Sequence, residues 1–216
     1  MTSISKNVTY THTNTYETLN ELTPKTKNIW LVFHGIGYLS RYFLKYFDEL
    51  PSEENYIIAP QAPSKYYLNN KYKHVGASWL TKENTKLETN NVITYVDTVL
   101  KAEGIGSEHN LIVFGYSQGV SIATRWIVNK NVNCYKLVLY AGGIPNELTS
   151  LDFQDLLKSN TEVITLVGDN DPYLTPERMK DEDKKIDDLF NRRAIKIVFE
   201  GGHEVKKELI NALIKH

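Results

Sequence analysis

Cysteine is nearly absent from this sequence: Cys134 is the only one in 216 residues. A single cysteine cannot form a disulfide within the chain, and so low a cysteine content is typical of proteins that work in a reducing compartment. Residues 1–7 also contain no apolar stretch of the kind that a secretory signal has. From these two observations we expect a cytoplasmic protein.

Long apolar runs and an excess of one charge are missing too. No stretch approaches the roughly 18–20 consecutive apolar residues that a membrane-spanning helix needs, so we expect no membrane span. The 25 lysines and arginines nearly balance the 26 aspartates and glutamates, for a formal net charge of −1. So balanced a chain has no overall field that would attract nucleic acid or an anionic membrane surface. We therefore expect no nucleic-acid partner.

The motifs that bind common metals and nucleotides are absent or incomplete. His203 begins the string His-Glu-Val-Lys-Lys, which has lysine where an H-E-x-x-H zinc site needs its second histidine. Gly35 and Gly37 do not belong to a complete G-x-G-x-x-G dinucleotide fingerprint, and no G-x-x-x-x-G-K-[ST] phosphate loop is present. No Cys/His cluster has the spacing of a zinc site. We expect neither a metal nor an organic cofactor.

What the chain does contain is a regular alternation of short apolar runs with amphipathic segments. The apolar runs that we expect to be strands are residues 29–33, 56–59, 111–114, 136–140, 163–167 and 195–199. The amphipathic segments that we expect to be helices are residues 40–50, 82–103, 120–128, 151–158, 176–193 and 204–214. This alternation predicts an α/β fold with a mostly parallel central sheet and helices on both faces. Residues 7–20, rich in β-branched and aromatic side chains, predict one or two antiparallel edge strands in addition.

Other features bear on the organisation of the chain. A length of 216 residues suits a single domain, 1–216, around one core. The connection after the strand at 136–140 is short, which leaves no room for a large cap domain. Residues 60–80 are predicted as a long loop of the kind that is often functional, and we expect it to border the site. Residues 176–193 are dense in charge, and we interpret the charges as a solvated outer face, not a binding site. One face of this predicted helix is apolar and includes Met179, Ile186, Leu189 and Phe190.

The sequence Gly115-Tyr-Ser-Gln-Gly119 follows one predicted strand and precedes a predicted helix. It fits the G-x-S-x-G nucleophile elbow, a sharp turn that projects a serine hydroxyl at the edge of a sheet. The two glycines suit a turn that is too tight for Cβ atoms beside a residue in strained backbone geometry. We therefore predict Ser117 as a nucleophile. The alternative is an ordinary strand-to-helix turn in which Ser117 only caps the helix.

A serine hydroxyl needs a base beside it, itself oriented by an acid, before it can attack a carbonyl group. Asp169 and Asp171 follow the predicted strand 163–167, and His203 follows the next predicted strand. The order Ser, Asp, His along the chain is that of α/β-hydrolases. His203 is thus the candidate base, and either aspartate is a candidate acid. Both residues also have a purely structural alternative: His203 could cap the last helix, and Asp171 could be a turn residue before Pro172.

The sequence resembles the α/β-hydrolases and, within them, the phospholipase/carboxylesterase group that includes the acyl-protein thioesterases. The segments that carry the resemblance span most of the chain: His-Gly-Ile-Gly at 34–37, Gly-Tyr-Ser-Gln-Gly at 115–119, Gly-Asp-Asn-Asp-Pro at 168–172, and Gly-Gly-His at 201–203. The resemblance implies an α/β-hydrolase fold. In the Gly-Asp-x-Asp-Pro loop of this group the second aspartate is the acid, so the resemblance assigns Asp171, with Asp169 as the fallback.

The same resemblance implies where an oxyanion would bind and which side chains would border the substrate. The backbone N–H groups of Ile36 and Gln118 are the expected oxyanion donors, and His34 is expected to support the loop that carries Ile36. The segment Val-Gly-Ala-Ser-Trp79 is similar to a tryptophan-bearing segment of these esterases, and Tyr38 stands where the group usually has an acidic residue. The candidate substrate wall consists of Tyr38, Trp79 and Tyr116.

Together these residues predict a carboxylesterase, a serine hydrolase that cleaves carboxylic esters of small to medium acyl chains through an acyl-enzyme. A thioesterase or a lysophospholipase would use the same serine, aspartate and histidine. An alternative of another class is a non-catalytic binding protein that retains the hydrolase fold. The partner that we expect is a small-molecule ester, bound in an open cleft.

Overall fold

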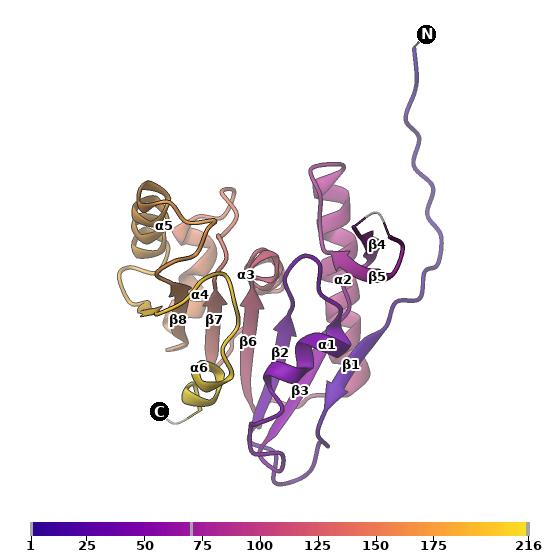
Figure 1. Cartoon of the computed structure of the whole chain (residues 1–216). Helices are drawn as coiled ribbons and strands as arrows, with labels where there is room; N and C mark the ends of the chain where they lie inside the picture. Colours follow the sequence, from indigo (N-terminus) through magenta and orange to yellow (C-terminus); the bar gives the residue numbers. More distant parts are fainter. Residues whose placement is uncertain (1, 70, 215–216) are drawn as a thin grey trace.

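The computed structural model describes residues 2–69 and 71–214. Within them, a sheet of seven strands runs through the molecule in the order β1-β3-β2-β6-β7-β8-β9 (Figure 1). In chain order the strands of this sheet are β1 (Tyr16–Leu19), β2 (Asn28–Phe33), β3 (Asn55–Pro60), β6 (Asn110–Tyr116), β7 (Lys136–Tyr140), β8 (Glu162–Gly168) and β9 (Ile195–Phe199). β1 pairs antiparallel with β3, and every other neighbouring pair is parallel. The predicted mostly parallel sheet is confirmed, with one antiparallel N-terminal strand; residues 2–15 form neither helix nor strand.

The central strands are buried, as their continuous apolar sequences predict. Every residue of β7 is buried, and β2 is buried from its second residue onward. Parallel strands joined by helices are covered on both faces, so neither face needs polar side chains. The register places Leu31 of β2 between Ile58 of β3 and Val113 of β6. The parallel strands all end at the same edge of the sheet, and the predicted site residues follow those ends.

Helices cover both faces of the sheet, which confirms the prediction (Figure 1). The helices are α1 (Ser40–Phe43), α2 (Thr85–Glu103), α3 (Gln118–Lys130), α4 (Gln154–Lys158), α5 (Pro176–Leu189) and α6 (Lys207–Ala212), with short 3₁₀ helices at Leu44–Tyr46 and Ser150–Phe153. On one face, α2, α3, α4 and the end of α5 share an apolar core that includes Val96, Ile122 and Leu189. On the other face, α1 and α6 share a core that includes Phe43 and Ile210.

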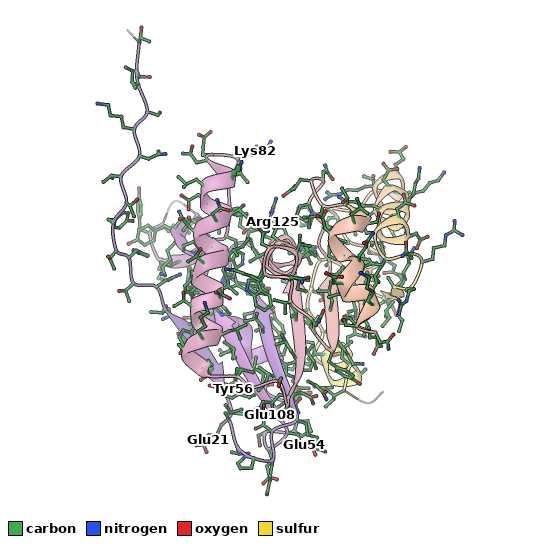
Figure 2. The ribbon with its side chains drawn as sticks, turned by 180° about the vertical axis from the view of Figure 1, so that it is seen from behind. Glu21, Glu54, Tyr56, Lys82, Glu108 and Arg125 are labelled. Carbon is green, nitrogen blue, oxygen red and sulfur yellow. The ribbon has the colours of Figure 1, made fainter. Side chains whose placement is uncertain are left out.

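Helix α2 runs along its face of the sheet, which Figure 2 shows from that side. Lys82 lies near the end at which the helix begins, and Tyr56 lies near the opposite end. There the Tyr56 hydroxyl donates a hydrogen bond of 2.6 Å to Oε2 of Glu103, the last helical residue. The helix begins later than residue 82, where its prediction begins, because Asn84 has a left-handed backbone conformation that cannot continue a right-handed helix.

Residues 60–80 are not the long loop that the sequence predicts. They contain a separate antiparallel hairpin of β4 (Ser64–Leu68) and β5 (His74–Ser78). The prediction is wrong because almost all of β4 is exposed, so the segment lacks the alternation of apolar and polar side chains by which strands are recognised. The two strands satisfy each other's backbone hydrogen bonds outside the main sheet.

The connection from β7 to β8 is short, as predicted. Residues 141–161 hold a 3₁₀ helix and α4, and a connection of this size contains no inserted cap domain. None of the described helices combines the length and the apolar character that crossing a membrane requires.

Asn55, at the start of β3, joins the amino ends of neighbouring strands and generates a first prediction. Its buried Oδ1 accepts hydrogen bonds from Nε1 of Trp30 at 3.0 Å and from Nδ2 of Asn28 at 3.1 Å. Asn55→Ala leaves the buried indole N–H of Trp30 without its acceptor, so we expect the free energy of unfolding in urea to fall by about 2 kcal/mol. The control Asn110→Ala removes an exposed hydrogen bond to Asn28 and is expected to cost less than about 0.5 kcal/mol. Equal losses in the two variants would contradict this account.

Candidate active site

Ser117 lies in a tight turn between the end of β6 and the start of α3. Its backbone has φ 53° and ψ −118°, a strained combination for a non-glycine residue that the surrounding structure must hold in place. Its N–H donates a hydrogen bond of 2.8 Å to the carbonyl oxygen of Tyr140 in β7. The turn also needs glycine at position 119, because a Cβ on Gly119 would lie 2.1 Å from the carbonyl oxygen of Phe33. This is the geometry of a nucleophile elbow.

Three of the predicted side chains meet at this turn. Asp171 follows β8 and His203 follows β9, so both lie at the sheet edge where β6 ends. Nε2 of His203 lies 2.9 Å from Oγ of Ser117, and Nδ1 of His203 lies 2.7 Å from Oδ2 of Asp171. The Ser117 side chain makes no capping hydrogen bond to α3, which argues against the alternative that it serves only as a cap.

The two candidate acids occupy different places in the loop after β8. The Asp171 side chain is only 1% exposed; one of its oxygens faces His203, and the other accepts a 2.9 Å hydrogen bond from the N–H of Tyr173. Asp169 is exposed, and its Oδ1 accepts a 2.9 Å hydrogen bond from the N–H of Gly201. Asp171 therefore contacts the imidazole, whereas Asp169 binds the segment that precedes His203.

Two tyrosines hold His203 in its orientation. The hydroxyl of Tyr116 donates a 2.9 Å hydrogen bond to the backbone carbonyl of His203, and the Tyr116 ring lies 5.3 Å from the imidazole, centre to centre. Burial raises the pKa of Tyr116 above its ordinary value of 10.0, so its hydroxyl remains a donor at neutral pH. The ring of Tyr173 meets the imidazole edge-on at 4.8 Å. The sequence did not indicate this role for Tyr116, because the motif leaves the position before the serine open.

The loop after β2 is held by His34, which is buried in the core. Nδ1 of His34 lies 2.8 Å from the carbonyl oxygen of Gly35, and Nε2 accepts a 3.2 Å hydrogen bond from the N–H of Ala62. The indole N–H of Trp79 donates to the carbonyl oxygen of His34 at 2.8 Å. Burial lowers the pKa of His34 to about 4, so the imidazole is neutral at physiological pH. These contacts agree with the expected supporting role of His34.

The same loop brings Ile36 to the cavity that Ser117 also lines. The N–H of Gly37 donates a 2.8 Å hydrogen bond to the carbonyl oxygen of Ala77, which ties the loop to the β4–β5 hairpin. In the described part of the chain, the N–H groups of Ile36 and Gln118 donate no hydrogen bond to another residue.

The side chain of Gln118 has a structural role that sequence reasoning, which considered only its backbone, missed. Its Oε1 accepts a 2.8 Å hydrogen bond from the N–H of Trp79, and its Nε2 donates a 2.7 Å hydrogen bond to the carbonyl oxygen of Leu80. The side chain thus joins the serine turn to the segment after β5. Gln118 belongs to the Gly-Tyr-Ser-Gln-Gly motif that carries the resemblance, and this was the one sign in the sequence that its side chain has a role.

A cavity of about 690 Å³ opens at Ser117, within the range of ~300–1,000 Å³ that is usual for small-molecule sites. Tyr38 and Tyr116, two members of the predicted substrate wall, line it. Trp79, the third predicted member, does not line the cavity, and its buried ring lies 5.0 Å from the imidazole of His34, centre to centre. The expectation that residues 60–80 border the cleft is also wrong, because the hairpin supports the loop at 34–37 and contributes no residue to the lining.

The other wall of the cleft comes from the segment after β7 and from α5. Residues 141–146 line it, together with a face of α5 that includes Met179, Glu182 and Ile186. The shared helical face that was predicted for Met179 and Ile186 thus borders the cleft. The interpretation of the charges of residues 176–193 as a solvated face and not a binding site is wrong for Glu182, which lines the cavity. Within the described residues, no cluster of three His, Cys, Asp or Glu side chains could hold a metal ion.

The chain was compared with family models and with known proteins. The model of the phospholipase/carboxylesterase family matches residues 14–216 of the chain. A search of curated proteins with the sequence found no match.

Among solved structures, the chain is similar to a phospholipase/carboxylesterase from Dyadobacter fermentans, with a TM-score of 0.67 and 21% identity over 97% of this chain and 100% of the other. It is similar to acyl-protein thioesterase 2 from Zea mays, with a TM-score of 0.67 and 13% identity over 93% and 96% of the two chains. It is also similar to a Bacillus cereus carboxylesterase, with a TM-score of 0.61 and 15% identity over 92% and 90%. At these identities the likeness establishes the α/β-hydrolase fold.

The buried His34 generates a prediction for the pH dependence of stability. Its pKa is about 4 in the folded protein against an ordinary value of 6.5, so below pH 6.5 the unfolded chain binds a proton that the folded chain does not. The neutral His34 therefore contributes to the free energy of unfolding. This contribution is fully present above pH 6.5 and is lost as the pH falls towards 4. Over this range we expect the free energy of unfolding to fall by about 3 kcal/mol more in the native protein than in His34→Asn. Urea titrations at several pH values measure the difference, and parallel pH profiles for the two proteins would refute it.

Proposed function

The chain belongs to the phospholipase/carboxylesterase family, and on this premise we propose that it is a carboxylesterase, a serine hydrolase that cleaves carboxylic esters of small to medium acyl chains. The observation that carries the proposal is the pair of contacts made by one imidazole, 2.9 Å to Ser117 Oγ and 2.7 Å to Asp171 Oδ2. A nucleophile, a base and an acid within hydrogen-bond reach are what acyl transfer through serine requires.

In the first half of the reaction, Ser117 Oγ attacks the ester carbonyl carbon while Nε2 of His203 accepts the hydroxyl proton. For this step Nδ1 of His203 carries the other proton and donates it in the hydrogen bond to Asp171. The carboxylate stabilises the imidazolium that forms, and it is held by the N–H of Tyr173 on its other oxygen. When the tetrahedral intermediate collapses, the C–O bond of the ester breaks. The imidazolium then gives its proton to the leaving alcohol, and the acyl group remains on Ser117.

In the second half, water attacks the acyl-enzyme and His203 again accepts and returns a proton. The carboxylic acid leaves and the Ser117 hydroxyl is restored. Each tetrahedral intermediate carries a negative oxygen, for which we propose the N–H groups of Ile36 and Gln118 as donors. Removing one donor of this kind typically costs on the order of 10²–10³ in rate. The contacts that hold His34, next to the loop that carries Ile36, support this assignment: its imidazole lies against the carbonyl oxygen of Gly35 and the N–H of Ala62.

Covalent labelling of the serine tests the function. We expect a fluorophosphonate probe to label the native protein and to leave Ser117→Ala unlabelled. We expect the same substitution to lower hydrolysis of p-nitrophenyl butyrate by at least about 10⁴-fold, because the nucleophile is lost. A matched control is Ser121→Ala, which removes a hydroxyl from the same cavity but leaves the nucleophile in place. A native protein that neither reacts with the probe nor hydrolyses the ester would instead be a binding protein with the hydrolase fold.

The two aspartates provide a separate test of the acid. Asp171→Asn removes the negative charge beside Nδ1 of His203, and we expect kcat to fall by about 10⁴-fold. Asp169→Asn keeps an oxygen that can accept from the N–H of Gly201, so we expect it to cost less than about tenfold. Steady-state kinetics on p-nitrophenyl butyrate compare the two variants. If Asp169→Asn were inactive and Asp171→Asn active, the acid would be Asp169.

A further inference from the structure

One carboxylate of helix α5, that of Glu182, lies on the side of the helix that lines the cavity at Ser117. Glu182 follows Met179 by three positions and precedes Ile186 by four, which is the spacing of neighbours on one helix face. All three residues line the cavity, and all three are half-buried. The Glu182 side chain therefore belongs to the inner face of α5 and not to its exposed face.

Two glycines that also line the cavity connect this carboxylate to the serine turn. A Cβ on Gly142 would lie 2.2 Å from the carbonyl oxygen of Ser117, so position 142 packs directly against the turn. A Cβ on the next residue, Gly143, would lie 3.0 Å from Oε1 of Glu182. Consecutive Cα atoms are only about 3.8 Å apart. Glu182 is therefore within reach of the substituents of an ester that is bound at Ser117.

The Glu182 carboxylate has no hydrogen-bond or ion-pair partner among residues 2–69 and 71–214. Two cationic side chains of α5 lie within one turn of it, and both are bound to backbone carbonyl groups instead. Arg178 donates to the carbonyl oxygen of Tyr173 at 2.9 Å, and Lys185 donates to the carbonyl oxygen of Ile144. A half-buried carboxylate without a partner gains most from a ligand that supplies a positive charge.

The charges that line the cavity are mostly negative. Three carboxylates line it, those of Asp171, Glu182 and Asp183, and the one guanidinium is that of Arg178. In a cleft, low-dielectric walls focus the field of an excess of one charge. The cavity therefore favours a cationic group over an anionic one.

We propose that Glu182 is a specificity-determining residue, which selects esters that carry a quaternary ammonium or protonated amine near the scissile carbonyl. This inference rests on the proposed function. The carboxylate pairs with the cation while the ester carbonyl lies at Ser117, and it takes no part in making or breaking bonds. Because the cation is present both before and during the reaction, the pairing lowers KM and leaves kcat nearly unchanged.

Two esters that differ only in charge test the proposal. One is the p-nitrophenyl ester of γ-trimethylammoniobutyrate, and the other is its carbon isostere, in which tert-butyl replaces the trimethylammonium group. We expect Glu182→Gln to lower the ratio of kcat/KM for the cationic ester to that for the neutral ester by about tenfold, mainly through KM, since a half-exposed ion pair is partly screened. Glu182→Lys is expected to lower the ratio further, because it replaces attraction with repulsion. Raising the NaCl concentration is expected to lower the native ratio.

The matched control is Glu177→Gln, which removes the same charge from an exposed position in the first turn of α5, outside the cavity lining. We expect it to keep the ratio within about twofold of native. Equal falls in Glu177→Gln and Glu182→Gln would overturn the proposal, because the effect would then come from the total charge of the helix.

A second pair of esters, acetylcholine and its carbon isostere, places the cation on the alcohol. A fall of the ratio in Glu182→Gln with either pair supports the proposal, and the pair that responds identifies which end of the ester carries the cation. No fall with either pair would overturn it. A native preference for p-nitrophenyl hydrogen glutarate over both butyrate-type esters would also overturn it, because the cavity would then select an anion through Arg178.

Labelling with the fluorophosphonate probe separates this inference from the proposed function. A native protein that is labelled at Ser117, but whose ratios do not respond to substitution of Glu182, would retain the proposed function without this specificity. A native protein that shows neither labelling nor hydrolysis of any of these esters would overturn both.

Discussion

The close approach of backbone segments at the carboxyl edge of the sheet is the constraint on which the candidate site depends. Ser117 has a strained backbone conformation that the surrounding structure must hold in place. The carbonyl oxygen of Tyr140 in β7 accepts a hydrogen bond from its N–H, and Gly119, which has no Cβ, lets α3 pack against the end of β2. These contacts join β2, β6 and β7 around a single residue. The position of the serine hydroxyl is therefore a property of the rigid sheet and not of a flexible loop.

Buried polar groups extend this rigidity to the neighbouring loop. The Gln118 side chain binds the backbone on either side of the Trp79–Leu80 peptide, and the Trp79 indole in turn binds the carbonyl oxygen of His34. A buried polar group that loses its partner costs free energy. Each of these hydrogen bonds therefore fixes the position of the residue that makes the next one. The result is that Ile36 and Gln118, which lie far apart in the sequence, are supported by one network. The hairpin belongs to this supporting layer, whereas α5 lines the cleft at Ser117.

The sequence predicted most of the sheet and helices because their signals are local. Continuous apolar runs such as 29–33 and 136–140 indicate strands buried on both faces, and the structure confirms them. The hairpin within residues 60–80 was missed because β4 is almost entirely exposed and does not alternate apolar with polar side chains. The sequence predicted a shared helical face for Met179 and Ile186, but it did not show that this face borders the cleft. The charges of residues 176–193 indicate a surface helix, and no sequence pattern reveals that part of a surface faces a cavity.

By itself, the sequence determined the alternation of strands and helices, the glycine-flanked turn at Ser117, and the placement of an aspartate pair and a histidine after later strands. These are properties of a residue and its near neighbours in the chain, and parallel strands necessarily bring their ends to one edge. Only the tertiary structure decided that Tyr116 holds His203, and that Trp79 is buried while α5 lines the cleft. The residue pattern left both aspartates open and the resemblance assigned Asp171; in the structure it is Asp171, and not Asp169, that faces His203. Such choices depend on the direction in which each side chain points after packing. That direction is set by contacts between segments that are distant in the sequence.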